Sequence, residues 1–170
     1  TQPSEPFFHM PEHPLRPRAC YYNMERLKVK IINRSGYELP AYETNEAAGM
    51  DVRAAIAEPI TLQSLDRALI PTGLRVQLPA GYEMQMRPRS GLALRHGITL
   101  ANSPGTVDAD YRGEISVIVI NLGREPFTIN PGERICQMVI APYTHIAWEP
   151  VEEIDRTRRG DGAFGHTGLD

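Results

Sequence analysis

Polar and apolar residues alternate along much of the chain from Leu27 onward, and this pattern constrains the fold more than any other feature. Successive side chains of a β-strand point to opposite faces of a sheet, so a period of two predicts strands with one face in solvent. The clearest runs lie at 27–31, 74–78 and 82–87. Short strands of this kind, separated by turn residues, predict an all-β sandwich or barrel.

Weaker signals complete this outline. We expect further strands near residues 50–55, 68–70, 115–120, 127–129 and 134–140. Residues 78–82 and 130–133 contain proline and glycine and are predicted to form hairpin turns. The helical candidate spans about 90–96, where Ser90 is placed to cap the first turn.

Composition restricts the class of ligand and the compartment. A chain of 170 residues, 41% of them hydrophobic, suits one domain with its own core. A formal charge of −3 and a pI near 6.0 disfavour nucleic acid as a partner. No apolar stretch is long enough to cross a membrane, and two cysteines without metal-site spacing suit a reducing compartment, so we expect a cytoplasmic protein.

The two ends differ from the middle of the chain. Prolines crowd the start, so residues 1–24 are predicted to form a flexible leader. Residues 25–148 carry the strand pattern and form the predicted β domain. Residues 149–170 read as a linker followed by a glycine-rich lid, which would need contacts with a ligand to become ordered. A merely disordered end is the alternative for this tail.

The loop at 102–114 combines turn residues, acids, an aromatic ring and a cation between two apolar segments, 97–100 and 115–120. Those segments should pair as hairpin arms that fix the loop in space. Asp108 in this loop is our candidate general base, because a carboxylate with a pKa of about 4 is ionised at neutral pH and can take a proton from water. An ordinary surface turn, with Asp108 only as its cap, is the alternative.

Glycine-containing segments recur at intervals along the chain. They lie at 47–55, 87–93, 102–114, 132–140 and 159–168. In this order and spacing they resemble the five motifs of the trimeric dUTPases over about residues 27–168. The resemblance implies a distorted jelly roll, a homotrimer with active sites shared between chains, and hydrolysis of dUTP to dUMP and pyrophosphate with Mg²⁺.

Site residues follow from matching these motifs. The resemblance implies that Asp108 activates the attacking water and that Tyr111 lies beneath the deoxyribose, excluding a 2′-hydroxyl. It implies that uracil is read by Asn102 and by main-chain groups of the same loop, and it assigns a weaker main-chain contact near Ser116. The loop residues that would contact the nucleotide through their backbone are Thr106 and Val107.

Phosphate contacts fall on other motifs. Arg89, Ser90 and Gly91 combine a guanidinium with free amides at the start of a helix, which suits an anion. The resemblance places Gln137 near the α-phosphate and lets Asp51 reach Mg²⁺ through water; a buried, satisfied amide and a structural acid are the alternatives. The tail would supply Arg159, Phe164, Gly165, His166 and Thr167, with Phe164 stacked on uracil.

Two other functions remain open at this point. A dCTP deaminase or a bifunctional relative would share the fold, although no separate set of residues for that chemistry stands out. A nucleotide sensor or interaction module without catalysis would be favoured by loss of Asp108 or Arg159, and both are present.

Overall fold

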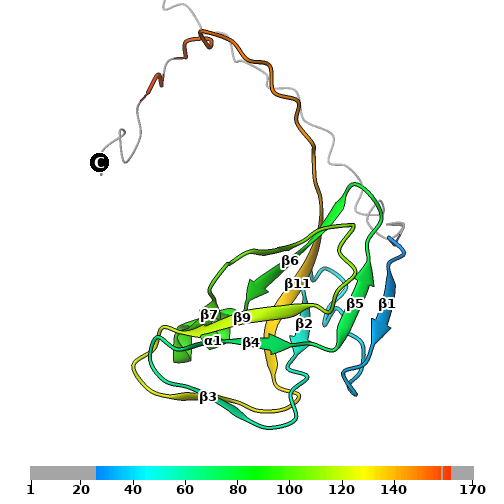
Figure 1. Ribbon diagram of the computed structural model, residues 1–170, viewed down its shortest axis with the longest axis vertical. Helices are drawn as coiled ribbons and strands as arrows, with labels where there is room; N and C mark the ends of the chain where they lie inside the picture. Colours follow the sequence, from blue (N-terminus) through cyan, green and yellow to red (C-terminus); the bar gives the residue numbers. More distant parts are fainter. Residues whose placement is uncertain (1–25, 158, 162–170) are drawn as a thin grey trace, which may run out of the picture.

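The computed structural model describes residues 26–157 and 159–161, and within these it consists of short strands and one short helix (Figure 1). In chain order the elements are β1 (Lys30–Asn33), β2 (Met50–Arg53), β3 (Ile60–Leu62), β4 (Arg67–Pro71), β5 (Leu74–Gln77), β6 (Tyr82–Pro88), α1 (Ser90–His96), β7 (Ile98–Leu100), β8 (Gly105–Val107), β9 (Ser116–Asn121), β10 (Phe127–Ile129) and β11 (Arg134–Pro142). The all-β class with one short helix is confirmed. In the described part of the chain no helix has the length and apolar character needed to cross a membrane.

Two antiparallel sheets carry most of the fold. One has the strand order β2-β11-β6-β8 and the other the order β4-β9-β7. Burial alternates along β9, where Val117 and Val119 are buried, as the period-two pattern requires. Two smaller pairs, β1 with β5 and β3 with β10, complete the strands.

A single apolar core joins the two sheets. Val52, Met86 and Met138 enter it from the four-stranded sheet, and Ile70 and Val119 from the three-stranded sheet. Each of these side chains is at most 3% exposed. Burial of apolar area, worth about 25 cal/mol per Å², holds the sheets face to face and leaves the connecting loops at the rim.

The predicted hairpin turns are present, but they do not join paired strands. In the first, the Tyr82 N–H donates to the Pro79 carbonyl at 3.3 Å, yet β5 pairs with β1 whereas β6 pairs with β11 and β8. The second, at 130–133, leads from β10 to β11, which also belong to different sheets. Proline and glycine determine where the chain turns, whereas the partner of each strand depends on which faces are apolar.

The first strand also departs from the prediction. The pattern placed it at 27–31, but β1 begins at Lys30 and all of its residues are exposed, including Ile31 at 37% and Ile32 at 52%. Within the described ranges β1 pairs only with β5, so its other edge and its faces stay open in one copy of the chain.

Leu65, between β3 and β4, has φ of 71°, a conformation that side chains other than glycine and asparagine rarely adopt. Its side chain is 69% exposed, so burial of the side chain offsets little of this backbone strain. We expect Leu65→Asn to raise the free energy of unfolding by about 0.5–1 kcal/mol, measured by urea denaturation. Leu69→Asn is the control, because Leu69 is also exposed (65%) but lies in strand β4 and should gain nothing. Equal effects of the two substitutions would contradict the assignment of strain to Leu65.

Candidate active site

Three of the predicted site residues meet on the four-stranded sheet. The register of β11 places Gln137 opposite Asp51 on β2 and opposite Arg87 on β6. Arg89 follows the end of β6 directly, before α1. Residues from distant motifs therefore reach one place because β11 lies between β2 and β6.

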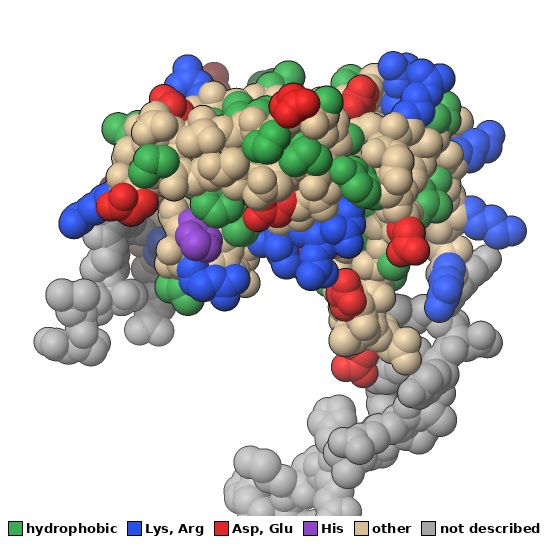
Figure 2. Space-filling model, turned by 90° about the horizontal axis from the view of Figure 1, so that it is seen from below, with side chains coloured by type: hydrophobic (Ala, Val, Ile, Leu, Met, Phe, Trp, Pro, Cys, Tyr) green, Lys and Arg blue, Asp and Glu red, His purple; other side chains and the backbone are tan. Residues whose placement is uncertain are grey.

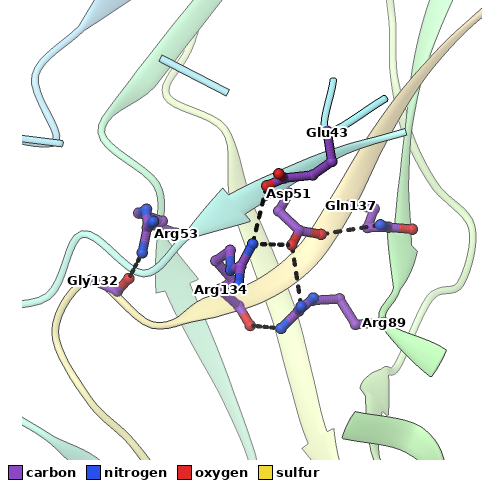
Figure 3. Close-up of polar contacts among 7 residues, drawn as sticks. All are labelled: Glu43, Asp51, Arg53, Arg89, Gly132, Arg134 and Gln137. Carbon is purple, nitrogen blue, oxygen red and sulfur yellow. Dashed lines mark hydrogen bonds and ion pairs between the residues drawn. The ribbon is translucent and has the colours of Figure 1, made fainter. Parts of the chain in front are cut away.

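Asp51 is the centre of this group (Figure 3). Its Oδ2 lies 3.1 Å from Nη2 of Arg89 and 3.2 Å from Nη1 of Arg134, and its Oδ1 accepts a hydrogen bond of 3.0 Å from Nε2 of Gln137. Arg89 is held a second time, because its Nη1 donates to the Arg134 carbonyl at 2.9 Å. Both carboxylate oxygens are thus engaged, and the Arg89 guanidinium has a fixed direction.

The surroundings of this network are partly open. The Asp51 side chain is 11% exposed, that of Arg89 29% and that of Arg134 42%, so all three side chains reach solvent. Arg134 also pairs with Glu43 on the loop before β2, at 3.2 Å. A cavity of about 110 Å³ borders the network, and Asp51, Glu43 and Arg134 contribute to its wall. Basic side chains gather near the centre of the face in Figure 2, which suits an anionic ligand.

The N-cap of helix α1 is one residue earlier than predicted. Arg89 is the N-cap residue, with extended φ and ψ and no side-chain hydrogen bond to the helix, and Ser90 is already helical. The prediction that Ser90 caps the first turn is therefore wrong, because the Ala93 N–H bonds to the carbonyl of Arg89. One consequence is that the Ser90 hydroxyl is not used for capping. Gly97 ends the helix in the left-handed conformation.

The loop at 102–114 is held at both ends. Its predicted arms do pair, with Leu100 opposite Val119, and β8 inside the loop adds to the edge of the other sheet along β6. The side chain of Asn102 lies against buried Gly105. Asp108 follows β8, and its exposed carboxylate has no hydrogen bond or ion pair with any residue in the described ranges. It is therefore free to bind water.

Asp108 and Asp51 do not come together within one chain. β2 and β8 are the two edges of the four-stranded sheet, so three strand spacings of about 4.8 Å separate them. The two groups also lie at different heights along β6. Gln137 of β11 pairs with Arg87, near the end of β6, whereas Val107 of β8 pairs with Met84, near its start. The structure therefore contains two separate groups of site residues, one around Asp51 and one around Asp108.

A sequence profile of the dUTPase family matches residues 35–168 of this chain. The chain belongs to the dUTPase family. Two relatives, both named deoxyuridine 5′-triphosphate nucleotidohydrolase, are 59% and 55% identical to it. The relative from Fusobacterium nucleatum aligns over 145 residues, 85% of this chain and 99% of its own length. The relative from Finegoldia magna aligns over 142 residues, 84% of this chain and 99% of its own length.

Solved dUTPase structures have the same fold. A mutant dUTPase of Staphylococcus bacteriophage 80alpha, solved with dUpNHpp, has a TM-score of 0.74 and 25% identity, covering 86% of this chain and all of the phage protein. A mutant dUTPase of phage phi11 has a TM-score of 0.66 and 23% identity and covers 78% of this chain and 100% of its own; it is described as revealing a structural Mg(II) ion. The jelly-roll assignment is therefore confirmed at the level of fold.

The remaining predicted residues of the dUTPase motifs are placed as follows. Thr106 is exposed on β8, Val107 packs partly against the core, and Ser116 opens β9 opposite Pro71. Arg159 is exposed and lies C-terminal to β11. The lid residues Phe164, Gly165, His166 and Thr167 lie outside the described residues.

The donor set at Asp51 suits an ion that is carried mainly by a ligand. No group of three His, Cys, Asp or Glu side chains that could hold a metal occurs in ranges 26–157 and 159–161. Asp51 is the acid nearest the predicted phosphate residues, and its oxygens already contact two guanidiniums and an amide. Such an acid fits contact with a hydrated Mg²⁺ through water better than direct coordination.

Cys136 lies beneath the network on β11 and is fully buried. Burial raises the pKa of its thiol to about 12, the Asp51 carboxylate adds to the rise, and Arg89 opposes it. The pKa of an unfolded thiol is about 9.0, so the contribution of the neutral buried thiol to stability is complete below that pH and is lost as the pH rises toward 12. We expect iodoacetamide at pH 8 to leave Cys136 unmodified in the native protein and to alkylate it after unfolding, as followed by peptide mass spectrometry. Rapid native alkylation would contradict this burial.

Proposed function

We propose that this chain hydrolyses dUTP to dUMP and pyrophosphate. The observation that supports this most is the 59% identity to a deoxyuridine 5′-triphosphate nucleotidohydrolase over 99% of that protein. The test is release of pyrophosphate from dUTP, compared with dCTP, dTTP and UTP. Selective turnover of dUTP is expected. Conversion of dCTP to a uracil product would favour the deaminase alternative, and binding without turnover would favour a nucleotide sensor.

The chemical step requires a base next to a water molecule. Asp108 takes a proton from that water as the water oxygen forms a bond to the α-phosphorus and the bond from the α-phosphorus to the bridging oxygen breaks. The electron pair of the broken bond leaves with pyrophosphate. The exposed carboxylate of Asp108, which has no partner in the described part of the chain, supports this role.

The phosphate chain belongs to the other group of residues. Arg89, fixed by Asp51 and by the Arg134 carbonyl, would bind a phosphate oxygen, together with Ser90, Gly91 and the Gln137 amide. Mg²⁺ bound to the phosphates would neutralise part of their charge, with Asp51 reaching it through water. A guanidinium that is already oriented loses little entropy on binding the triphosphate.

The nucleoside would lie in the loop at 102–114. Asn102 and the main chain at Thr106, Val107 and Ser116 would read uracil, since the amide of Asn102 offers both a donor and an acceptor. The half-exposed ring of Tyr111 would lie beneath the deoxyribose. A 2′-hydroxyl would then either clash with this ring or lose its hydrogen-bond partners.

A homotrimer with shared sites would bring the two groups of residues together. After β11 the chain continues as an extended arm that leaves the body of the molecule (Figure 1). Ile146, Trp148 and Ile154 on this arm are 66%, 86% and 86% exposed, which is typical of apolar residues that pack against another copy. Sedimentation should give a trimer, and an active monomer would contradict shared sites.

The lid would complete the site from the tail. Phe164 would stack on uracil, Arg159, His166 and Thr167 would reach the terminal phosphate, and Gly165 would also contact the substrate. We expect Phe164→Ala to weaken dUTP binding by about 1–3 kcal/mol, the usual contribution of a base stacked on an aromatic ring, and to leave the melting temperature unchanged. Titration calorimetry with a non-hydrolysable dUTP analogue measures the affinity. Unchanged affinity would contradict the lid.

The organisation along the chain is also part of this proposal. Residues 25–148 would form the catalytic β domain and residues 149–170 the linker and lid, whereas the leader predicted at 1–24 lies outside the described residues. The enzyme would act in the cytoplasm.

A further inference from the structure

The descending arm of the loop at 102–114 is fastened to a turn far away in the sequence. Oε1 of Glu114, two residues before β9, accepts a hydrogen bond of 2.9 Å from the N–H of Gly73, which lies between β4 and β5. We propose that Glu114 is a positioning residue that selects deoxyribose over ribose by fixing the ring of Tyr111. This inference rests on the proposed function, in which that ring lies beneath the sugar.

The ring of Tyr111 takes its position from the backbone of Glu114. The Tyr111 hydroxyl donates to the Glu114 carbonyl at 2.9 Å. The ring also lies against Gly113, where an added Cβ would overlap the hydroxyl. Since the ring is 45% exposed, solvent rather than protein covers much of it. Its place therefore depends on where the Glu114 backbone is held.

The turn that receives the Glu114 side chain is itself fixed. Gly73 has φ of +67°, and a Cβ there would come within 2.5 Å of the Ser35 backbone. The Gly73 carbonyl also accepts a hydrogen bond of 2.7 Å from the Arg34 N–H. A turn that touches a neighbouring segment this closely cannot shift with the loop, so it is a firm anchor.

Hydrogen bonds from neighbouring residues fix Ile115, whereas Glu114 is fixed through its own carboxylate. Ile115 bonds to this turn through its N–H, which donates to Leu74 at 2.8 Å, and through its carbonyl, which accepts from the Thr72 hydroxyl at 2.7 Å. The chain between Asp108 and Glu114 lies outside the regular strands. The Arg112 guanidinium donates within the loop, to the carbonyls of Ala109 at 2.7 Å and Tyr111 at 2.8 Å. The Glu114 carboxylate instead ties this end of the loop to the Gly73 turn outside it.

The chemical difference between the two sugars is one hydroxyl group. A rigid ring excludes it by contact, whereas a ring that can retreat by about 1 Å admits it, since steric exclusion rises steeply over that distance. Loosening Glu114 should therefore raise turnover of UTP relative to dUTP. A residue needed only for folding would lower both together.

Two substitutions distinguish the length of the Glu114 side chain from its charge. Glu114→Gln keeps an oxygen at the same distance for the Gly73 N–H but loses the charge. Glu114→Asp keeps the charge but is one methylene too short. We expect the ratio of kcat/KM for dUTP to that for UTP to stay within threefold of wild type in the glutamine variant and to fall at least tenfold in the aspartate variant. The opposite order, or no change in either, would overturn the proposal.

Asp66→Ala is the matched control. The Asp66 carboxylate also accepts from a backbone N–H, that of Gln63 at 2.9 Å, but it lies before β4 at the end opposite Pro71. Its dUTP/UTP ratio should equal that of wild type. If Glu114→Asp does not fold, Tyr111→Phe decides, because it removes only the hydroxyl that bonds to Glu114; an unchanged ratio would overturn the proposal.

The same comparison can be made without turnover. The ratio of the Kd values for dUMP and UMP, measured by calorimetry, should change in the same variants and in the same order. If the wild-type protein binds dUMP selectively but does not cleave dUTP, the proposed hydrolysis is refuted. The ratio of the two Kd values in the variants then still tests the role of Glu114. Equal binding of dUMP and UMP by the wild type would overturn the inference.

Discussion

Asp108→Asn is expected to lower kcat for dUTP about 10²–10⁴-fold, because the amide cannot take a proton from the attacking water. Asparagine has nearly the same shape, and the Asp108 side chain has no hydrogen bond or ion pair with the described residues that the change would break. Affinity for a non-hydrolysable dUTP analogue should therefore remain within a few-fold. Single-turnover kinetics and calorimetry measure the two quantities separately.

Asp110→Asn is the control for this substitution. Asp110 is an exposed acid on the same loop, and like Asp108 it has no side-chain partner in residues 26–157 and 159–161. Its replacement removes the same charge from the same region and should leave kcat nearly unchanged. Equal losses in the two variants would indicate a general electrostatic effect, and a normal kcat in Asp108→Asn would refute the assignment of the base.

Asp51→Asn is expected to lower the free energy of unfolding by about 1–3 kcal/mol. The substitution leaves the guanidiniums of Arg89 and Arg134 next to each other without the carboxylate between them. The loss should be smaller than for a fully buried pair, because Arg134 is 42% exposed. Urea denaturation measures it, and a higher Mg²⁺ requirement should accompany it if Asp51 contacts the ion through water.

Glu43→Gln tests whether Asp51, at the centre of the network, contributes more to stability than the exposed Glu43 at its edge. The Glu43 side chain is 75% exposed, and its one ion pair within the described part of the chain is with Arg134. Exposed ion pairs contribute little, so we expect a change below about 0.5 kcal/mol. If both substitutions cost the same, Asp51 is not the centre of the network in solution.

Local patterns were sufficient for the class of fold. Alternation predicted β5 and β6, weaker signals predicted strands near β2, β4, β9, β10 and β11, and the helix was placed at its observed bounds. Strand β8 inside the loop was not predicted, and strand β3 was missed too, although it is no shorter than β10. Its position depends on pairing with β10 and on buried Asn121, whose side chain donates to the Leu62 carbonyl at 3.0 Å. Such long-range contacts leave no local signal.

The candidate site was predicted only in part, because some of its residues are joined by long-range contacts that leave no local signal in the sequence. Asp51, Arg89 and Gln137 belong to recognisable motifs, and the sheet brings them together. Arg134 was not predicted as a site residue, although it contacts both Asp51 and Glu43. Nothing near Glu43 in the sequence indicates its role, because the loop that carries it reaches Arg134 only in the folded chain.

Trp148 is the single tryptophan of the chain, and it lies on the arm that follows β11 with 86% of its surface in solvent. Indole emission moves to shorter wavelength when protein replaces the water around the ring. Intrinsic fluorescence therefore reports on this one segment without any added label. A blue-shifted spectrum that reddens on dilution would give the dissociation constant of the assembly directly.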